Sequence, residues 1–328
     1  GSLAFAMGQQ FVAQIDLGGL KTIASDLATA FTTLGVDLSV VMPNFTADNP
    51  LMPLNVQAIT IGGANLTGFV GIGGPYRYGD DADNDGLPDN INESAIGLVI
   101  DDVDFGFAMM TPTIFAMFPQ LASITPRFIS AKAKVGYAGL VGIDPDILSV
   151  KAEDVEVNIN TFFLPLQPPQ LAAVVNVALQ LFGPPSINYQ ATFPDSPEDK
   201  NVNGVLDLYD EALNKNGNLD PGEDLNGNGI LDLTEDLNRD GLLAPYGMAL
   251  WAGGNNAVIL DFKEEIIQAK VGYVEVNLAG FLQMSASMAL TKKGSETVTL
   301  SNGEETYVTS LAIGINDANG FIGIPVGG

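Results

Sequence analysis

The chain contains neither cysteine nor histidine among its 328 residues. These absences exclude disulfides, zinc sites, and catalysis that depends on a cysteine nucleophile or a histidine base. Positive charge is also scarce, with 13 Lys and Arg against 39 Asp and Glu. A chain with a net charge of −26 lacks the basic surface of a nucleic-acid-binding protein, and an anionic membrane surface would repel it.

Long uninterrupted apolar runs are missing as well. Residues 105–126 are uncharged and largely apolar, but Pro112, Pro119 and Pro126 interrupt them. A membrane span needs about 20 predominantly apolar residues, so we expect no membrane insertion. No signal peptide is visible either, and the location of the protein must be argued from its chemistry.

Apolar and polar residues alternate with a period of two through much of the chain, which is typical of half-buried β-strands. The clearest segments are residues 129–137, 155–160 and 274–290. Residues 297–300 and 307–309 flank a short polar turn and predict a β-hairpin. Helix is expected only for residues 25–34 and 170–182.

A self-similarity links two distant parts of the sequence. Residues 58–72 recur as residues 312–324, with 9 identities in 13 aligned positions when residues 66–67 are skipped. Ala133–Tyr137 (Ala-Lys-Val-Gly-Tyr) recurs as Ala269–Tyr273. We predict a tandem array whose unit is about 250 residues long. Neighbouring units of such an array stack on one another and give an elongated molecule.

The acidic residues are clustered rather than spread along the chain. Residues 80–104 and 195–240 together hold 22 of the 39 acids, and glycines recur within them. Calcium prefers six to eight oxygen ligands, which a 12-residue loop supplies from positions 1, 3, 5, 7, 9 and 12 around a glycine at position 6. Gly204, Gly217, Gly229 and Gly241 recur at a nearly constant spacing of one loop length, as tandem loops of this kind require.

Five segments follow the calcium-loop template, and the loops that begin at Asp199 and Asp224 match it fully. The predicted ligands of several Ca²⁺ ions are Asp81, Asp83, Asp85, Asp89, Glu93, Asp199, Asn201, Asn203, Asp207, Asp210, Asn214, Asn216, Asp220, Glu223, Asp224, Asn226, Asn228, Asp232, Glu235, Asp236, Asn238 and Asp240. In the first loop, position 12 is Asn92 and Glu93 comes one residue late. The third loop has Ala212 at position 1, and the fifth lacks acids at positions 9 and 12.

The loops are similar to EF-hand loops in ligand pattern, but flanking helices have no room. Glu223 directly precedes Asp224, and Glu235 directly precedes Asp236. The arrangement resembles thrombospondin type 3 repeats, and the loop at Asp199 also resembles a dockerin loop. These resemblances imply that calcium replaces a hydrophobic core and stiffens the chain. The Gly-Phe-Val-Gly-Ile phrase at residues 68–72 resembles repeat units of very large bacterial surface or adhesin-like proteins.

Calcium is expected to contribute folding free energy to these segments, because the loop carboxylates repel one another without metal. Asn in place of Asp lowers the ligand charge and favours weak binding, with Kd of roughly 10⁻⁴–10⁻³ M as in extracellular modules. We therefore expect a secreted or cell-surface protein.

The predicted fold is all-β: an elongated, repetitive antiparallel sheet, or a β-solenoid-like or sandwich arrangement, with inserted calcium-binding loops and one or two short helices. Residues 1–194 are expected to form a β-repeat region with one calcium loop (79–94). Residues 195–243 would be a tandem calcium-loop insertion. Residues 244–328 would be a β-repeat region that leads into the next repeat.

An enzyme without Cys or His would need paired carboxylates, as glycosidases use. Asp101, Asp102 and Asp104 are candidates, but they also suit additional ligands for the first calcium loop. No catalytic residue is predicted. We expect a calcium-stabilised structural or adhesive repeat that contacts neighbouring repeats or self-assembles. The alternatives are a calcium-dependent module that binds a carbohydrate or a cell-surface protein, and a subunit of a filament or sheath.

Overall fold

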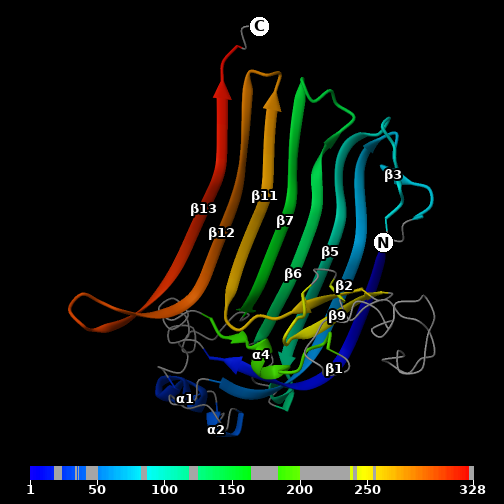
Figure 1. Cartoon of the computed structure of the whole chain (residues 1–328). Coiled ribbons are helices and arrows are strands. Elements are labelled where there is room, and N and C mark those ends of the chain that lie inside the picture. Colours follow the sequence, from blue (N-terminus) through cyan, green and yellow to red (C-terminus); the bar gives the residue numbers. More distant parts are fainter. Residues whose placement is uncertain are drawn as a thin grey trace, which may run out of the picture.

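The computed structural model describes residues 1–17, 24–33, 35, 37–41, 51–82, 87–117, 125–163, 184–199, 237–238, 242–253 and 256–324. One antiparallel sheet of nine strands dominates it, in the order β13-β12-β11-β7-β6-β5-β2-β1-β8 (Figure 1). Its strands are β1 (Ser2–Asp16), β2 (Leu51–Ile72), β5 (Ile96–Pro112), β6 (Arg127–Val141), β7 (Leu148–Phe163), β8 (Ser186–Ile187), β11 (Ile266–Leu278), β12 (Leu282–Thr299) and β13 (Glu305–Ile322). The predicted all-β class is confirmed.

Two small hairpins and four short helical segments complete the described part. They are β3 (Arg77–Tyr78) with β4 (Asn90–Ile91), β9 (Met248–Gly253) with β10 (Asn256–Leu260), the α-helices α1 (Ala24–Thr33), α2 (Leu38–Val41) and α4 (Tyr189–Thr192), and the 3₁₀-helix η2 (Thr113–Met117). None of the helices in the described segments is long and apolar enough to cross a membrane.

Most strand predictions are confirmed because their period of two matches the pleat of a sheet. Residues 129–137 lie in β6, and the predicted hairpin joins β12 to β13. The alternating run 274–290 is two strands, because the chain turns between Leu278 and Leu282. The first predicted helix is α1, and the second, residues 170–182, lies outside the described residues.

The β9–β10 hairpin packs over part of β1, β2, β5 and β6 and helps to enclose the hydrophobic core against them (Figure 1). Gly62 and Gly106 make this contact close, because a Cβ at Gly62 would overlap the backbone of Trp251 and one at Gly106 would meet Val258 and Leu250. The core residues are Ala13, Ile15, Leu17, Met52, Leu54, Val56, Ala58, Ala108, Met110, Phe128, Ile187, Tyr189, Leu250, Leu260 and Phe262.

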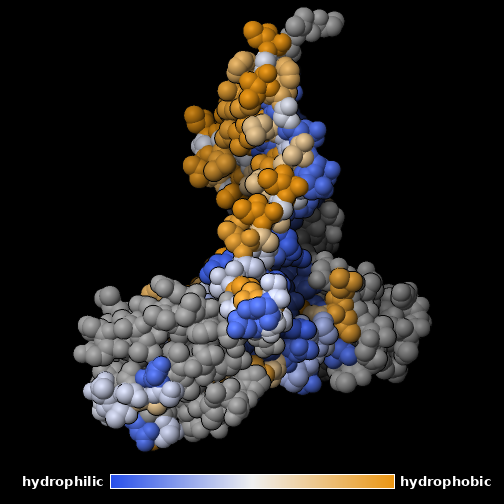
Figure 2. Space-filling model, turned by 90° about the vertical axis from the view of Figure 1, so that its left-hand side faces the viewer, coloured by the Kyte–Doolittle hydropathy of each residue, from blue (hydrophilic) through white to orange (hydrophobic). Residues whose placement is uncertain are grey.

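The opposite face of the sheet carries exposed apolar side chains and is called the apolar face below. Its members lie on both edges and in the middle of the sheet: Leu3, Phe5, Met7, Val70, Leu98, Val150, Met284, Met288, Leu290, Ile313 and Ile315. Seen from the β13 edge, hydrophobic side chains gather on one side of the sheet and hydrophilic ones on the other (Figure 2). The sheet is therefore amphipathic across its thickness.

A row of backbone irregularities crosses the sheet. Asn65, Asp102, Asp154 and Asp317 have φ between 50° and 54°, in the left-handed region that Asn and Asp tolerate best. They lie in β2, β5, β7 and β13. Glycines occupy neighbouring strands at this level: a Cβ at Gly272 would lie 2.8 Å from the Cβ of Asp154.

The two copies of the Ala-Lys-Val-Gly-Tyr motif flank one strand symmetrically. Lys134 in β6 and Lys270 in β11 both lie opposite Glu156 of β7. Tyr137 and Tyr273 both lie opposite Glu153. The motif is therefore duplicated because both copies pair with the same stretch of β7.

The longer repeat also has the same pairing in both copies. Ile59 of β2 lies opposite Met7 of β1, and its counterpart Ile313 of β13 lies opposite Leu290 of β12. The left-handed residues Asn65 and Asp317 are counterparts as well, each in an irregular stretch of its strand. When the two copies are aligned by structure instead of by identity, the two skipped residues are 63–64 and no longer 66–67. The β12–β13 ladder is then the counterpart of the β1–β2 ladder.

Candidate functional site

The first predicted calcium loop is closed at its base by the β3–β4 hairpin. Arg77 pairs with Ile91 and Tyr78 with Asn90 in the two strands. Beyond them the Asp89 N–H donates to the Asp80 carbonyl over 3.0 Å, and the Asp89 carboxylate accepts from the Ala82 N–H over 2.9 Å. The predicted ligands Asp81 and Asp89 therefore lie at the two sides of one narrow neck.

An ion pair anchors this neck to the sheet. The Arg77 Nε lies 2.7 Å from the Asp101 Oδ2, and Arg77 also donates to the Pro88 carbonyl. Asp101 is 5% exposed and accepts a second hydrogen bond, of 2.6 Å, from the Thr67 hydroxyl. Asp101 thus has a structural role that the sequence did not reveal.

The last position of the first loop has a different role from the one the template assigns. The Asn92 amide donates to the carbonyls of Gly73 and Pro75, and its oxygen accepts from the Ser94 N–H. Glu93, the next residue, is exposed. Asn92 therefore fastens the stem to the segment that follows β2, and Asp81, Asp89 and Glu93 stay predicted ligands beside the described neck.

The predicted tandem insertion is fastened by a fully buried carboxylate. Glu198 is 0% exposed, and its two oxygens accept hydrogen bonds of 3.0 Å from the Leu237 N–H and 2.7 Å from the Ala244 N–H. The Leu237 carbonyl accepts from the Ala257 N–H of β10 over 2.8 Å. One side chain therefore joins the beginning of the insertion to its end and to a strand of the core.

Both predicted calcium regions reach one groove on the face of the sheet opposite the apolar face, here called the polar face. The groove has a volume of about 520 Å³ and lies along the row of left-handed residues. Leu87 belongs to the first loop and Asn238 to the fifth, and both line the groove. Its sheet residues include Asp102, Asp104, Lys134, Asp154 and Glu156. Carboxylates outnumber cationic groups here, which favours a positively charged or hydroxyl-rich ligand.

Asp102 and Asp104 were candidates for extra ligands of the first loop. The Asp104 carboxylate accepts a 2.8 Å hydrogen bond from the Asn65 N–H, so it holds the irregular backbone of β2. Asp102 itself adopts a left-handed conformation beside Gly136. Both line the groove with Leu87, close to the loop but engaged with the sheet.

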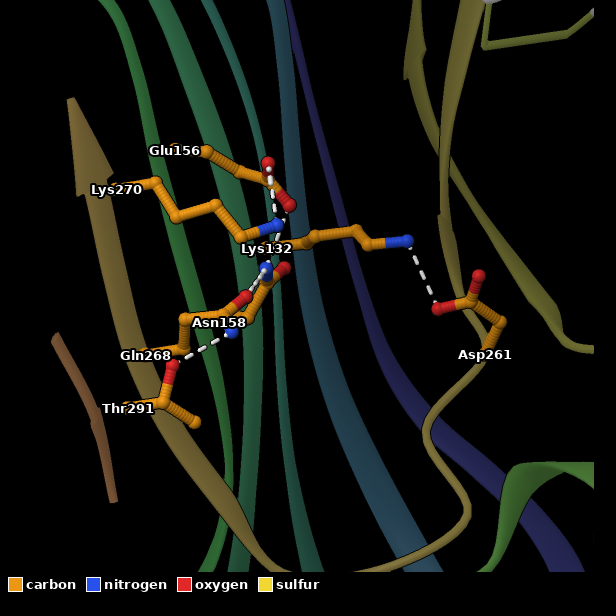
Figure 3. Close-up of polar contacts among 7 residues, drawn as sticks. All are labelled: Lys132, Glu156, Asn158, Asp261, Gln268, Lys270 and Thr291. Atoms are coloured by element: carbon orange, nitrogen blue, oxygen red, sulfur yellow. Dashed lines mark hydrogen bonds and ion pairs between the residues drawn. The ribbon is translucent and has the colours of Figure 1, made fainter. Parts of the chain in front are cut away.

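Next to the groove, a polar ladder crosses four strands (Figure 3). The Asn158 amide donates to Glu156 over 2.6 Å and to Gln268 over 3.1 Å, and Gln268 donates to Thr291 over 2.8 Å. Lys270 pairs with Glu156 at 3.2 Å. Burial opposes ionisation of Glu156, but these hydrogen bonds and the positive charges of Lys270 and Lys132 together lower its pKa.

The ladder also connects the sheet to the hairpin that covers it. Lys132 of β6 extends away from the other ladder residues and donates to Asp261, which follows β10, over 2.8 Å (Figure 3). Most of the described polar contacts of the ladder residues join one ladder residue to another, although the buried Asn158 Oδ1 has no hydrogen-bond partner. We therefore regard the ladder as a structural brace between the sheet and the segment that leads from the insertion into β11.

Most predicted metal ligands lie outside the described residues. These are Asp83, Asp85, Asp240 and every predicted ligand from Asn201 to Asp236. Within the described segments, no three acidic side chains converge in a way that could hold a metal ion. Carboxylate and amide oxygens, the kind of ligand that calcium prefers, are present at the described necks. The neck of the first loop places Asp81 and Asp89 on its two sides.

Comparison with known proteins gave no assignment: no protein-family model, curated protein or solved structure matches the chain. The chemistry of the site must therefore be argued from its own residues.

Sequence reasoning missed Glu198, the Arg77–Asp101 pair and the acidic partners of the repeated motif. For the last of these a signal was present, since Asp101-Asp102-Val103-Asp104 in β5 and Glu153-Asp154-Val155-Glu156 in β7 share one pattern. Glu198 had no such signal, because its partners Leu237 and Ala244 lie 39 and 46 residues further along the chain, at the far end of the insertion. Only the fold brings them together.

Proposed function

We propose that the chain is a calcium-stabilised structural or adhesive repeat of an extracellular surface or matrix protein. The observation that carries this proposal is the way the predicted calcium segments are inserted. Each begins and ends at a fixed stem: Arg77 and Asp101 hold the first to the large sheet, and Glu198 connects the second to the β9–β10 hairpin through Leu237. Metal bound in such loops would stiffen segments whose ends are already held.

The amphipathic sheet supports a role in association rather than catalysis. Exposed apolar patches larger than a few hundred Å² usually mark interaction surfaces. The apolar face carries side chains such as Val70, Leu98 and Met284 that are about half exposed or more. Of the carboxylates around the groove, Asp104 accepts a backbone hydrogen bond and Glu156 belongs to the polar ladder, so these two act as structural groups.

Thermal unfolding with calcium and with EGTA tests the proposal. If one site binds with Kd near 10⁻⁴ M, 10 mM calcium should stabilise the fold by about 2.7 kcal/mol. The loop variant Asp224→Asn/Asp232→Asn should lose part of this gain. The matched variant Asp26→Asn/Asp146→Asn removes two exposed acids outside the predicted loops and should keep it. An identical melting temperature in calcium and EGTA would refute the proposal.

The groove favours one alternative, a module that binds a sugar through calcium. It lies where both predicted calcium regions meet the sheet, and carboxylates and the Asn65 and Asn238 side chains line it. Screening a glycan array in calcium and in EGTA tests this alternative. Binding that needs calcium and is lost in Asp154→Asn would establish it, and binding to no glycan in calcium would exclude it.

A further inference from the structure

The two copies of the repeated ladder differ in how much of the same side chain is covered. In β2, Ile59 and Ile61 lie between β1 and β5 and are half-buried. Their counterparts in β13, Ile313 and Ile315, are 65% and 60% exposed. Among the described strands, β13 is the edge strand of the sheet and β12 is its one neighbour. The difference therefore corresponds to the place that β5 fills beside β2.

The other edge of the sheet shows the same relation. Phe5 and Met7 of β1 are 62% and 70% exposed, whereas their counterparts in β12, Met288 and Leu290, are 44% and 45% exposed. β12 has β11 beside it, whereas among the described strands β1 pairs on that side only with the two-residue strand β8, at Ile15 and Asp16. Each edge thus exposes residues that a neighbouring strand covers in the other copy.

We propose that the free edge of β13 accepts a strand with the sequence of β5, supplied by the next repeat of the same protein. This inference rests on the proposed array and names the contact that would extend it. In the known ladder Ile59, Thr60 and Ile61 lie opposite Met109, Ala108 and Phe107. When this pairing is transferred to the second copy, Ile313, Gly314 and Ile315 take partners equivalent to these three.

The chemistry of the edge fits such a partner. An edge strand presents unpaired N–H and C=O groups, and an added antiparallel strand satisfies them. Side chains equivalent to Met109 and Phe107 would cover Ile313 and Ile315. Gly314 leaves room for a neighbour, because a Cβ placed there meets nothing within 4 Å. Recognition would thus combine backbone pairing with apolar contacts on one face of the added strand.

The absence of cysteine permits a direct test of register. The variant Gly314→Cys is mixed with a synthetic peptide of residues 97–111 that carries cysteine in place of Ala108 and lysines at both ends for solubility. Directly opposed residues of an antiparallel pair have Cα atoms about 4.5–5.5 Å apart, within the range of a disulfide. The disulfide forms by thiol–disulfide exchange in a buffer of oxidised and reduced glutathione, in which one oxidised glutathione is reduced to two thiols for each disulfide made.

The matched control peptide has its cysteine in place of Met109 instead, with Ala108 kept. A one-residue slip turns the thiol to the other face, so we expect the first peptide to form the disulfide about tenfold faster. A chain with Ser301→Cys, in the β12–β13 turn, should react equally with both peptides. Equal rates at Gly314→Cys, or disulfide-linked dimers of that chain in preference to peptide adducts, would overturn the inference.

The assay is run in calcium and in EGTA so that two failures remain distinct. A melting temperature that ignores calcium rejects the proposed function, whereas register selectivity reports on the β13 edge alone. A folded chain that gains stability from calcium but shows no selectivity would reject the edge contact and leave the calcium role standing.

Discussion

Glu198 offers a sharp test of how the predicted calcium insertion is connected to the sheet. Its buried carboxylate accepts from the N–H groups of Leu237, near the far end of the insertion, and Ala244, directly after it. Hydrogen bonds to charged groups contribute about 1.5–3 kcal/mol each, and a buried donor left without a partner adds a penalty. The substitution Glu198→Ala should therefore weaken closure of the neck by about 3–6 kcal/mol.

The Ala257 amide is the best reporter of this closure. Its hydrogen bond goes to the Leu237 carbonyl, so the bond does not involve the mutated side chain directly. If closure limits its hydrogen exchange, a loss of about 3–6 kcal/mol accelerates exchange about a hundredfold or more. Glu198→Gln should give an intermediate effect, since one amide oxygen can still accept. Asp195→Ala, an exposed acid three residues earlier, should leave exchange unchanged.

The measurement is amide exchange read by mass spectrometry, in calcium and in EGTA. Unchanged protection of Ala257 in Glu198→Ala would show that the insertion is held by other contacts, and the reasoning would be refuted. If Glu198 does fasten the insertion, the calcium-dependent gain in melting temperature should also shrink in Glu198→Ala, because metal binding is then no longer coupled to the sheet.

Three further predictions concern the sheet. Gly272→Ala should cost about 1–3 kcal/mol in urea unfolding, because the new Cβ meets the Asp154 Cβ, whereas Gly314→Ala has open space and should cost nothing. Asn160→Ala should cost about 2–4 kcal/mol, because Asn160 is buried and donates to the carbonyls of Ile187 and Glu264, while exposed Asn55→Ala should be near neutral. Burial raises the pKa of Glu265, so the ionised carboxylate destabilises the fold at neutral pH. Glu265→Gln should therefore raise the free energy of unfolding by about 1–3 kcal/mol at pH 7. This difference should vanish as the pH falls below about 4, where glutamate is protonated in the unfolded chain as well. Urea unfolding of both proteins across pH 3–8 checks the last prediction, and a gain that persists at pH 3 would contradict it.

Local pattern predicted the strands well, since alternation such as that of residues 129–137 reflects one covered face. It did not predict which strands are neighbours. β7 and β11 lie side by side although Phe163 and Ile266 are separated by a long insertion. The duplicated Ala-Lys-Val-Gly-Tyr motif was visible in the sequence, but its reason is a common partner in β7, which no local rule supplies.

The site divides in the same way. Glycine period and acid spacing predict calcium loops, because ligand spacing within one loop is a local property; most of the predicted ligands lie outside the described residues, and calcium binding stays a prediction. The stems depend on residues that are distant in sequence, as Arg77 is from Asp101 and Glu198 is from Ala244. The left-handed conformations of Asp102 and Asp154 were also not predicted, since acidic residues in an alternating strand look like ordinary solvent-facing positions.

The in-register duplication of the β1–β2 ladder has a mechanical consequence. If each repeat adds its six long strands side by side, the sheet grows across its strands by about 29 Å per repeat, at about 4.8 Å per strand. Tension along that direction would open the ladders one hydrogen bond at a time, as a zipper opens. Tension along the strands would load a whole ladder, such as the one between β12 and β13, at once. A continuous sheet of this kind would resist force along its strands far better than force across them.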